Sequence, residues 1–366
     1  MNREHYHRLG EYIQQVDVRN RDLTVTNLLG VSIAKTFIPS IANTIGTDMS
    51  TYKIVEPYQF AYGPVTSRNG DKITFALYKG EEKCIVSSAY VTFEIIDKGT
   101  LDPDYLMMWA LRPEFDRYAR FMSNGSAREI FSWEDMCDVY LPVPEIDVQR
   151  RIVSEYKAVK ARINCNIKLL NKLEESTQTL FREQFSRYND DVIVPEGWRI
   201  AEFGEFCDIF TGKKDVNQSL PVGPYRFFSC SAENYFSNEF ISEGPAVIIA
   251  GNGYTGRTVF SRDPFDLYQR AYACVPRNER ELTLIYFLYA VAKFFFEPSC
   301  QDSSRGTTIQ YIVRGDLEGF KFTYNEDAAL LFSKRMKSIM DYSISLSAEN
   351  DSLQSMISCL LSKMTN

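Results

Sequence analysis

The sequence predicts an α+β protein in which two similar globular mixed α/β domains are separated by two long helices. We expect the helices to pack as an antiparallel coiled coil and the whole chain to show a pseudo-twofold internal duplication. Short patterns recur at an offset of 181 residues, as where Leu101–Leu106 matches Leu282–Phe287 and Gly125–Ile130 matches Gly306–Tyr311. Each copy also ends in a heptad-patterned run without glycine or proline. A unit of this size is a whole domain plus a long helix, not a short solenoid repeat.

The first predicted domain covers residues 1–144. Its strand-like runs include Lys83–Val86 and Tyr90–Ile96, and Thr66–Asp71 has the composition of a turn. A helix is expected around Tyr105–Met122, because Asp102–Asp104 places an acidic residue and a proline where helices begin.

The two predicted spacer helices cover residues 145–188 and 326–366. Both carry an apolar seam with alternating spacings of four and three, which favours a coiled coil over an ordinary amphipathic helix. The first seam is Ile152, Tyr156, Val159, Ile163, Asn166, Leu170, Leu173, Thr177, Leu180 and Gln184. The second, 180 positions later, is Phe332, Met336, Ile339, Ser343, Leu346, Asn350, Leu353, Ile357, Leu360 and Met364.

Each seam contains one asparagine, and this predicts a register. If Asn166 faces Asn350 in an antiparallel pair, the neighbouring layers become Ile163–Leu353 and Leu170–Leu346, which are apolar. A buried asparagine pair can fix register at some cost in stability. The alternative is that both asparagines face solvent on a loose seam.

The second predicted domain covers residues 189–325, and within it Phe203–Phe206 repeats the pattern of Leu9–Tyr12. Gly251–Gly256 follows the apolar run Ala246–Ala250 and has the form of a dinucleotide-binding fingerprint. That fingerprint requires a helix next, whereas Arg257–Pro264 is β-branched and ends in proline. We therefore expect a strand–turn–strand hairpin whose loop presents Asn252, Tyr254 and Arg257, with a purely structural turn as the alternative.

Composition excludes several classes of protein. The 366 residues carry a net charge of −7, which argues against a protein that simply coats DNA. Only two histidines occur, and the eight cysteines form no Cys-x-x-Cys pair, so a zinc site or a catalytic triad has little material. A polar N-terminus and the absence of a long apolar run predict a cytoplasmic protein with reduced, buried thiols and no membrane contact.

Several motifs resemble the specificity (S) subunit of type I restriction–modification systems. Gly125–Met136, then Leu141–Pro144, then Gln149–Val153 is similar to that family's passage from a target-recognition domain into its central helix. Val194–Trp198 followed by Thr211–Lys213 looks like the opening of its second recognition domain. The second junction departs from the pattern.

The resemblance implies a sequence-specific DNA-binding subunit that is not an enzyme itself. Each target-recognition domain would read one half of a bipartite site in double-stranded DNA, and the helices would set the spacing. Two modification (methyltransferase) subunits and ATP-dependent restriction subunits would be its partners. S-adenosylmethionine, ATP and Mg would belong to those partners, and this chain would hold no cofactor. A duplicated coiled-coil scaffold without DNA binding is the alternative from another class, and a stand-alone nuclease is a third.

Polar and basic residues in predicted loops are the candidate DNA contacts, because asparagine pairs with adenine edges and arginine with guanine edges or phosphate. In the first domain they are Lys35, Arg68, Asn69, Lys72 and Arg128. In the second they are Lys213, Lys214, Asn252, Tyr254, Arg257, Arg270, Ser304 and Arg305. For each of them, ordinary solvated surface is the alternative.

Overall fold

A computed structural model describes residues 6–40, 46–67, 70, 72–123, 129–187, 193–303 and 311–364. The chain forms two compact units. We call residues 1–165 with 349–366 unit 1, and residues 166–348 unit 2. Each unit therefore contains one globular part and one portion of each long helix.

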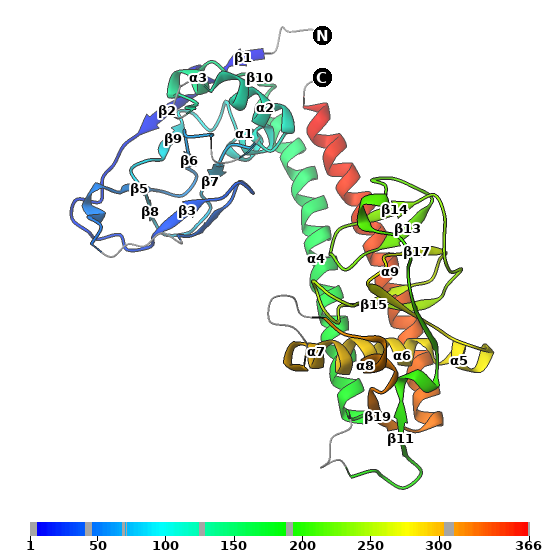
Figure 1. Ribbon diagram of the computed structural model, residues 1–366. Coiled ribbons are helices and arrows are strands. Elements are labelled where there is room, and N and C mark those ends of the chain that lie inside the picture. The colour runs from blue at the N-terminus through cyan, green and yellow to red at the C-terminus, as the bar shows by residue number, and fades with distance from the viewer. Residues whose placement is uncertain are drawn as a thin grey trace. The chain divides into compact units, whose positions relative to one another are not determined.

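Unit 1 contains short strands, short helices and part of the helix pair (Figure 1). Its strands are β1 (Tyr6–Arg8), β2 (Ile13–Val16), β3 (Leu29–Val31), β4 (Phe37–Pro39), β5 (Lys53–Val55), β6 (Phe60–Tyr62), β7 (Phe75–Leu77), β8 (Cys84–Val86), β9 (Val91–Ile95) and β10 (Tyr140–Pro142). Its short helices are η1 (Leu9–Glu11), η2 (Met49–Thr51), α1 (Pro103–Ala110), α2 (Pro113–Met122) and α3 (Trp133–Cys137).

The main sheet of unit 1 has the antiparallel order β2-β9-β6-β7. Its buried aromatic side chains, such as Phe60, Phe75 and Phe93, pack with Tyr105 and Leu106 of α1 in one apolar core. The strands expected at Lys83–Val86 and Tyr90–Ile96 are confirmed as β8 and β9.

The single helix expected at Tyr105–Met122 is wrong, because the structure divides it into α1 and α2. Pro113 is the first residue of α2, and Arg112 before it is extended, with φ −73° and ψ 139°. Proline has no N–H for the helical ladder and disfavours helical backbone in the residue before it. The predicted start is correct, since the Asp102 carboxylate accepts hydrogen bonds from the N–H groups of Asp104 and Tyr105.

Unit 2 has a similar make-up. Its strands are β11 (Arg199–Glu202), β12 (Asp208–Thr211), β13 (Tyr225–Phe228), β14 (Tyr235–Ser237), β15 (Ala246–Ala250), β16 (Thr258–Ser261), β17 (Phe265–Leu267), β18 (Ala271–Val275) and β19 (Lys321–Tyr324). Its helices are η3 (Phe203–Glu205), η4 (Val216–Gln218), α5 (Glu279–Thr283), α6 (Ile285–Val291), η5 (Ala292–Phe296, a π-helix), α7 (Glu297–Ser303) and α8 (Arg314–Glu318).

The sheets confirm the duplication. The order β12-β18-β15-β16 in unit 2 repeats β2-β9-β6-β7, and all of these pairs are antiparallel. In both units a first strand pairs with a last one, β1 with β10 and β11 with β19, and a 3-10 turn follows the first strand. The copies differ beside the main sheet: β5 pairs antiparallel with β8, whereas β13 pairs antiparallel with β14 and parallel with β17.

The long helices are α4 (Ile146–Gln184) and α9 (Glu326–Lys363), close to the predicted spans. In unit 1, Tyr156 near the start of α4 shares a core cluster with Ile357 and Met364 near the end of α9, as an antiparallel pair requires. Beside them, the Arg162 guanidinium donates to the Glu349 carboxylate at 2.8 Å.

In unit 2, the seam of α4 shifts by one residue after Thr177. The predicted core positions Leu180 and Gln184 are exposed, Leu180 by 57%, while Phe181 and Phe185 are buried. Their rings lie 5.1 Å and 5.8 Å from the ring of Phe332 in α9. A straight helix has 3.6 residues per turn and drifts from a 3.5-residue seam, so the core-facing positions move along the chain.

Candidate nucleic-acid interface

Three loops of unit 2 are joined to one another by hydrogen bonds, and we call them the loop cluster. They are Ser229–Asn234 between β13 and β14, Gly251–Arg257 between β15 and β16, and Tyr268–Arg270 between β17 and β18. The Arg270 carbonyl joins all three loops, because it accepts from the Gly251 N–H at 3.0 Å and from the Cys230 thiol at 3.2 Å. Segments distant in sequence thus form one surface.

Glycines permit this close approach. A Cβ on Gly251 would lie 2.3 Å from the Arg270 carbonyl oxygen, so no larger residue fits without movement. Gly253 and Gly256 have φ of +65° and +81°, in the region that side chains disfavour. β15 and β16 pair antiparallel around the loop, with Ile249 opposite Thr258. The predicted hairpin is confirmed.

The loop cluster presents amide, aromatic and cationic side chains. Tyr254 is 61% exposed, Arg270 is exposed and Asn252 is half-buried. A pocket of about 470 Å³ opens beside them, lined by Gly251, Asn252, Gln269, Arg270, Tyr272, Tyr311 and Ile312. Such side chains can hydrogen-bond to base edges and stack on bases. Gln269 and Tyr311 were not among the sequence candidates, because only folding brings them to Asn252.

Arg257 points into the loop cluster and lies near a residue that the sequence analysis missed. Its Nη1 donates to the Ser231 carbonyl at 2.6 Å. Arg226 in β13 is exposed, donates to the Asn234 side-chain oxygen and lies close enough to Arg257 to interact electrostatically. A single arginine in the aromatic run Tyr225–Phe228 was the available signal.

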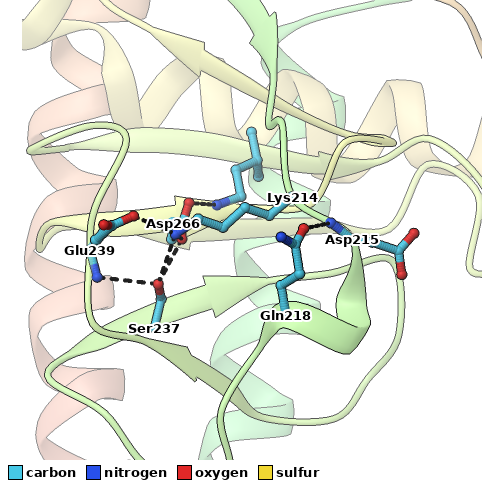
Figure 2. Close-up of polar contacts among 7 residues, drawn as sticks. Lys214, Asp215, Gln218, Ser237, Glu239 and Asp266 are labelled. Carbon is cyan, nitrogen blue, oxygen red and sulfur yellow. Dashed lines mark hydrogen bonds and ion pairs between the residues drawn. The ribbon is translucent and has the colours of Figure 1, made fainter.

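The neighbouring lysines behave differently from each other. Lys213 is exposed. Lys214 forms ion pairs with Asp266 and Glu239, as Figure 2 shows. The Lys214 ammonium donates to the Asp266 carboxylate at 2.7 Å and to Glu239 at 2.9 Å, and the Ser237 hydroxyl donates to the same Asp266 oxygen at 2.7 Å. The hydrogen bonds to Asp266 and Glu239 raise the pKa of Lys214. Lys214 therefore holds strands together.

In unit 1, Lys35 is also committed to the fold. It is 6% exposed, lies 2.8 Å from the Asp116 carboxylate and donates to the Ala110 carbonyl. Burial lowers the pKa of its ammonium, although Asp116 counteracts this. A side chain placed in this way is not presented to DNA. Lys72 is exposed and could reach a ligand.

Other sequence candidates lie outside the described residues: Arg68, Asn69, Arg128, Ser304 and Arg305. The asparagines proposed to set the helix register are Asn166, which is 1% exposed, and Asn350, which is half-buried. Asn166 belongs to unit 2 and Asn350 to unit 1, so their pairing stays a prediction.

Two surveys of the described residues complete the picture. No cluster of three or more histidine, cysteine, aspartate or glutamate residues among them is placed to hold a metal ion. Over the same residues, no helix is both long and apolar enough to cross a membrane. The cysteines are free, and the expectation that all are buried is wrong for Cys165 and Cys359, which are exposed on the long helices.

Comparison with known proteins identifies the region that carries the loop cluster. Residues 195–325 match the family model of the type I restriction modification DNA specificity domain. We call residues 195–325 the specificity domain, after the family model that they match. The Escherichia coli type I restriction enzyme EcoDI specificity subunit is 33% identical over 130 residues, which cover 34% of this chain and 27% of that subunit. The resemblance inferred from sequence is confirmed.

Solved structures extend the likeness in fold from the specificity domain to the whole chain. The S subunit of a type I restriction–modification system from M. genitalium matches with a TM-score of 0.62 and 13% identity, over 99% of this chain and 96% of that one. A chain from a structural study of complex assembly and conformational transition in the type I R-M system matches with a TM-score of 0.51 and 17% identity, over 99% and 97%. The fold is that of type I specificity subunits.

Proposed function

We propose that the chain is the specificity subunit of a type I restriction–modification complex. In this proposal it binds double-stranded DNA, and each globular part reads one half of a bipartite site. The loop cluster carries the proposal, because it gathers Asn252, Tyr254, Arg257 and Arg270 on one surface of the specificity domain. The repeated sheet order in unit 1 supports a second, similar reader.

The charge distribution supports a role in reading rather than coating DNA. Residues 189–325 contain 13 basic and 18 acidic residues, so the domain is net negative. Affinity for DNA depends on phosphate neutralisation. We therefore propose that this chain binds DNA weakly by itself and that partner subunits supply much of the phosphate contact.

The proposed partners are two modification subunits, docked along α4 and α9, and restriction subunits. S-adenosylmethionine would belong to the modification subunits, and ATP with Mg to the restriction subunits. In this arrangement the chain performs no chemistry, and the length and register of the helix pair set the gap between half-sites, much as dimer geometry sets half-site spacing.

A methylome tests the proposal. The chain is expressed together with a type I modification subunit in a host without adenine methylation, and modified bases are mapped with and without the chain. We expect a bipartite adenine motif with a fixed gap that appears only when the chain is present. A motif that forms equally without the chain would contradict the proposal and favour the protein-binding scaffold.

A further inference from the structure

Arg226 and Arg257, which we call the arginine pair, both donate hydrogen bonds to the loop at Ser229–Asn234. Arg226 extends from β13 and donates to the Asn234 side chain, while Arg257 ends the β15–β16 loop and donates to the Ser231 carbonyl at 2.6 Å. Neutral oxygens therefore orient both guanidinium groups within the same region of the loop cluster. These uncharged oxygens orient the two guanidinium groups but do not neutralise their positive charges.

No carboxylate neutralises this pair within the described part of the chain. The acidic residue of the adjoining loop, Glu233, accepts from the Tyr235 hydroxyl, and no ion pair joins it to either arginine. Lys214, in the same domain, has two carboxylates. A domain with more acidic than basic residues thus neutralises its structural lysine and leaves the arginine pair uncompensated.

Two neighbouring positive charges repel each other, and an anion that binds both of them offsets this repulsion. A base edge offers neutral acceptors and can satisfy one guanidinium, whereas a phosphate offers a full negative charge and several acceptor oxygens. The uncompensated charge of the arginine pair among the described residues therefore favours phosphate.

We propose that Arg226 and Arg257 together clamp one backbone phosphate of the half-site read by the specificity domain. The inference rests on the proposed function, since it assigns a ligand group within that DNA interface. The clamp fixes the position of the duplex, so that Asn252 and Arg270 of the same loop cluster face base edges. Arg226 and Arg257 thus contribute affinity and orientation, and the neighbouring residues contribute sequence preference.

The test uses the chain in complex with its modification subunits and a duplex that contains the motif found by the methylome. Dissociation constants are measured by fluorescence anisotropy across a salt series for wild type, Arg226→Gln, Arg257→Gln and the double variant. One lost phosphate contact lowers the slope of log affinity against log salt by about 0.9. We expect this change, and at least a tenfold weaker affinity, for the double variant.

The matched control is Arg280→Gln, which removes an exposed arginine of the same unit that is paired with Glu326, away from the loop cluster. It should leave the slope unchanged. Duplexes with one neutral methylphosphonate linkage then locate the contact: one position should weaken wild type and have no effect on the double variant. If Arg257→Gln unfolds the loop by removing the contact with Ser231, the single variant Arg226→Gln is used for the test instead.

Several outcomes would overturn the clamp. An unchanged slope in the double variant removes the contact, and a fall of about 1.8 indicates two separate phosphates. A change confined to one base of the methylated motif assigns the arginines to base reading instead. If wild-type complex neither binds nor methylates a defined site, the proposed function fails, and this result is distinct from failure of the clamp.

Discussion

At the residue scale, burial and pairing separate the cations that build the fold from those that are free for a ligand. Lys35 and Lys214 are as basic in sequence as Lys72 and Lys213, but only the first two meet carboxylates inside the structure. The sequence could not distinguish them, because Asp116 and Asp266 lie far from their lysine partners along the chain. Arg226 was missed for the same reason: its significance arises from Arg257, which belongs to another loop.

The Lys35–Asp116 pair yields a stability prediction. Lys35→Met should lower the free energy of unfolding by about 3 kcal/mol, because it leaves the partly buried Asp116 carboxylate, which is 13% exposed, without its cation. Chemical denaturation measures the change. Lys72→Met is the control, since Lys72 is exposed, and it should alter stability by less than about 0.5 kcal/mol. Equal losses for the two variants would contradict the assignment.

Asp104 predicts a dependence on pH. Burial raises its pKa, but hydrogen bonds from Lys157 and Lys79 outweigh this and lower the pKa below 3.8. A carboxylate with a depressed pKa stabilises the fold above pH 3.8, and the contribution is lost as pH falls through the lower, folded-state value. As the pH falls below 3.8, the melting temperature of Asp104→Asn should therefore decrease less than that of wild type. Parallel acid curves for the two proteins would argue against the ion pairs.

At the element scale, uninterrupted periodicity in the sequence predicted helices well, whereas local breaks in them were predicted poorly. The sequence predicted α4 and α9 closely, because heptad runs without glycine or proline favour one continuous helix. It predicted the β15–β16 hairpin because the run Arg257–Pro264 is β-branched and ends in proline. The break at Pro113 was missed, although a proline within a helical pattern is itself a signal for a break. The seam shift after Thr177 could not be predicted, because it depends on the packing of Phe181 against a globular core.

The seam shift can be tested with neighbouring residues. Phe181→Ala should lower the free energy of unfolding by about 3–5 kcal/mol, because it leaves a cavity among the aromatic rings around Phe332. Leu180→Ala is the matched control and should cost less than about 1 kcal/mol, because Leu180 is 57% exposed. Denaturant titration of both variants decides between the shifted seam and the original heptad, which gives the reverse order.

The asparagine pair predicts the register of the helices. Replacing both Asn166 and Asn350 by leucine should raise the melting temperature and weaken the preference for one register, since buried asparagine fixes register at a cost in stability. In the methylome, the motif gap should then become mixed. Replacing Leu173 and Leu346 by methionine, which conserves volume, should keep the gap. If both double variants gave a motif with a single gap length, the asparagines would not be what fixes the helix register.

At the scale of the whole molecule, the duplication is visible in the amino-acid sequence itself. Patterns at an offset of 181 residues predicted two related domains, and the equivalent sheet orders confirm them. Divergence between the copies was not predictable. Strand pairing beside the main sheet depends on which distant segments meet, as when β13 pairs parallel with β17.

If each globular part reads one half-site, as proposed, the two halves of the motif should change independently. Asn252→Ala should change the recognised bases in only one half of the methylated motif, because Asn252 belongs to the specificity domain at residues 195–325. The other half and the gap should stay as in wild type. Modified-base sequencing of the variant measures both halves at once. Equal changes in both halves would contradict independent reading.

The paired first and last strands of each globular part determine how that part is joined to the rest of the chain. Glu202 and Lys321 lie opposite each other where β11 and β19 meet, and neighbours across an antiparallel pair are about 5 Å apart. The chain enters and leaves through a narrow neck. Any segment that replaces the residues between them must therefore have ends equally close and an apolar surface that packs against Phe181 and Phe332.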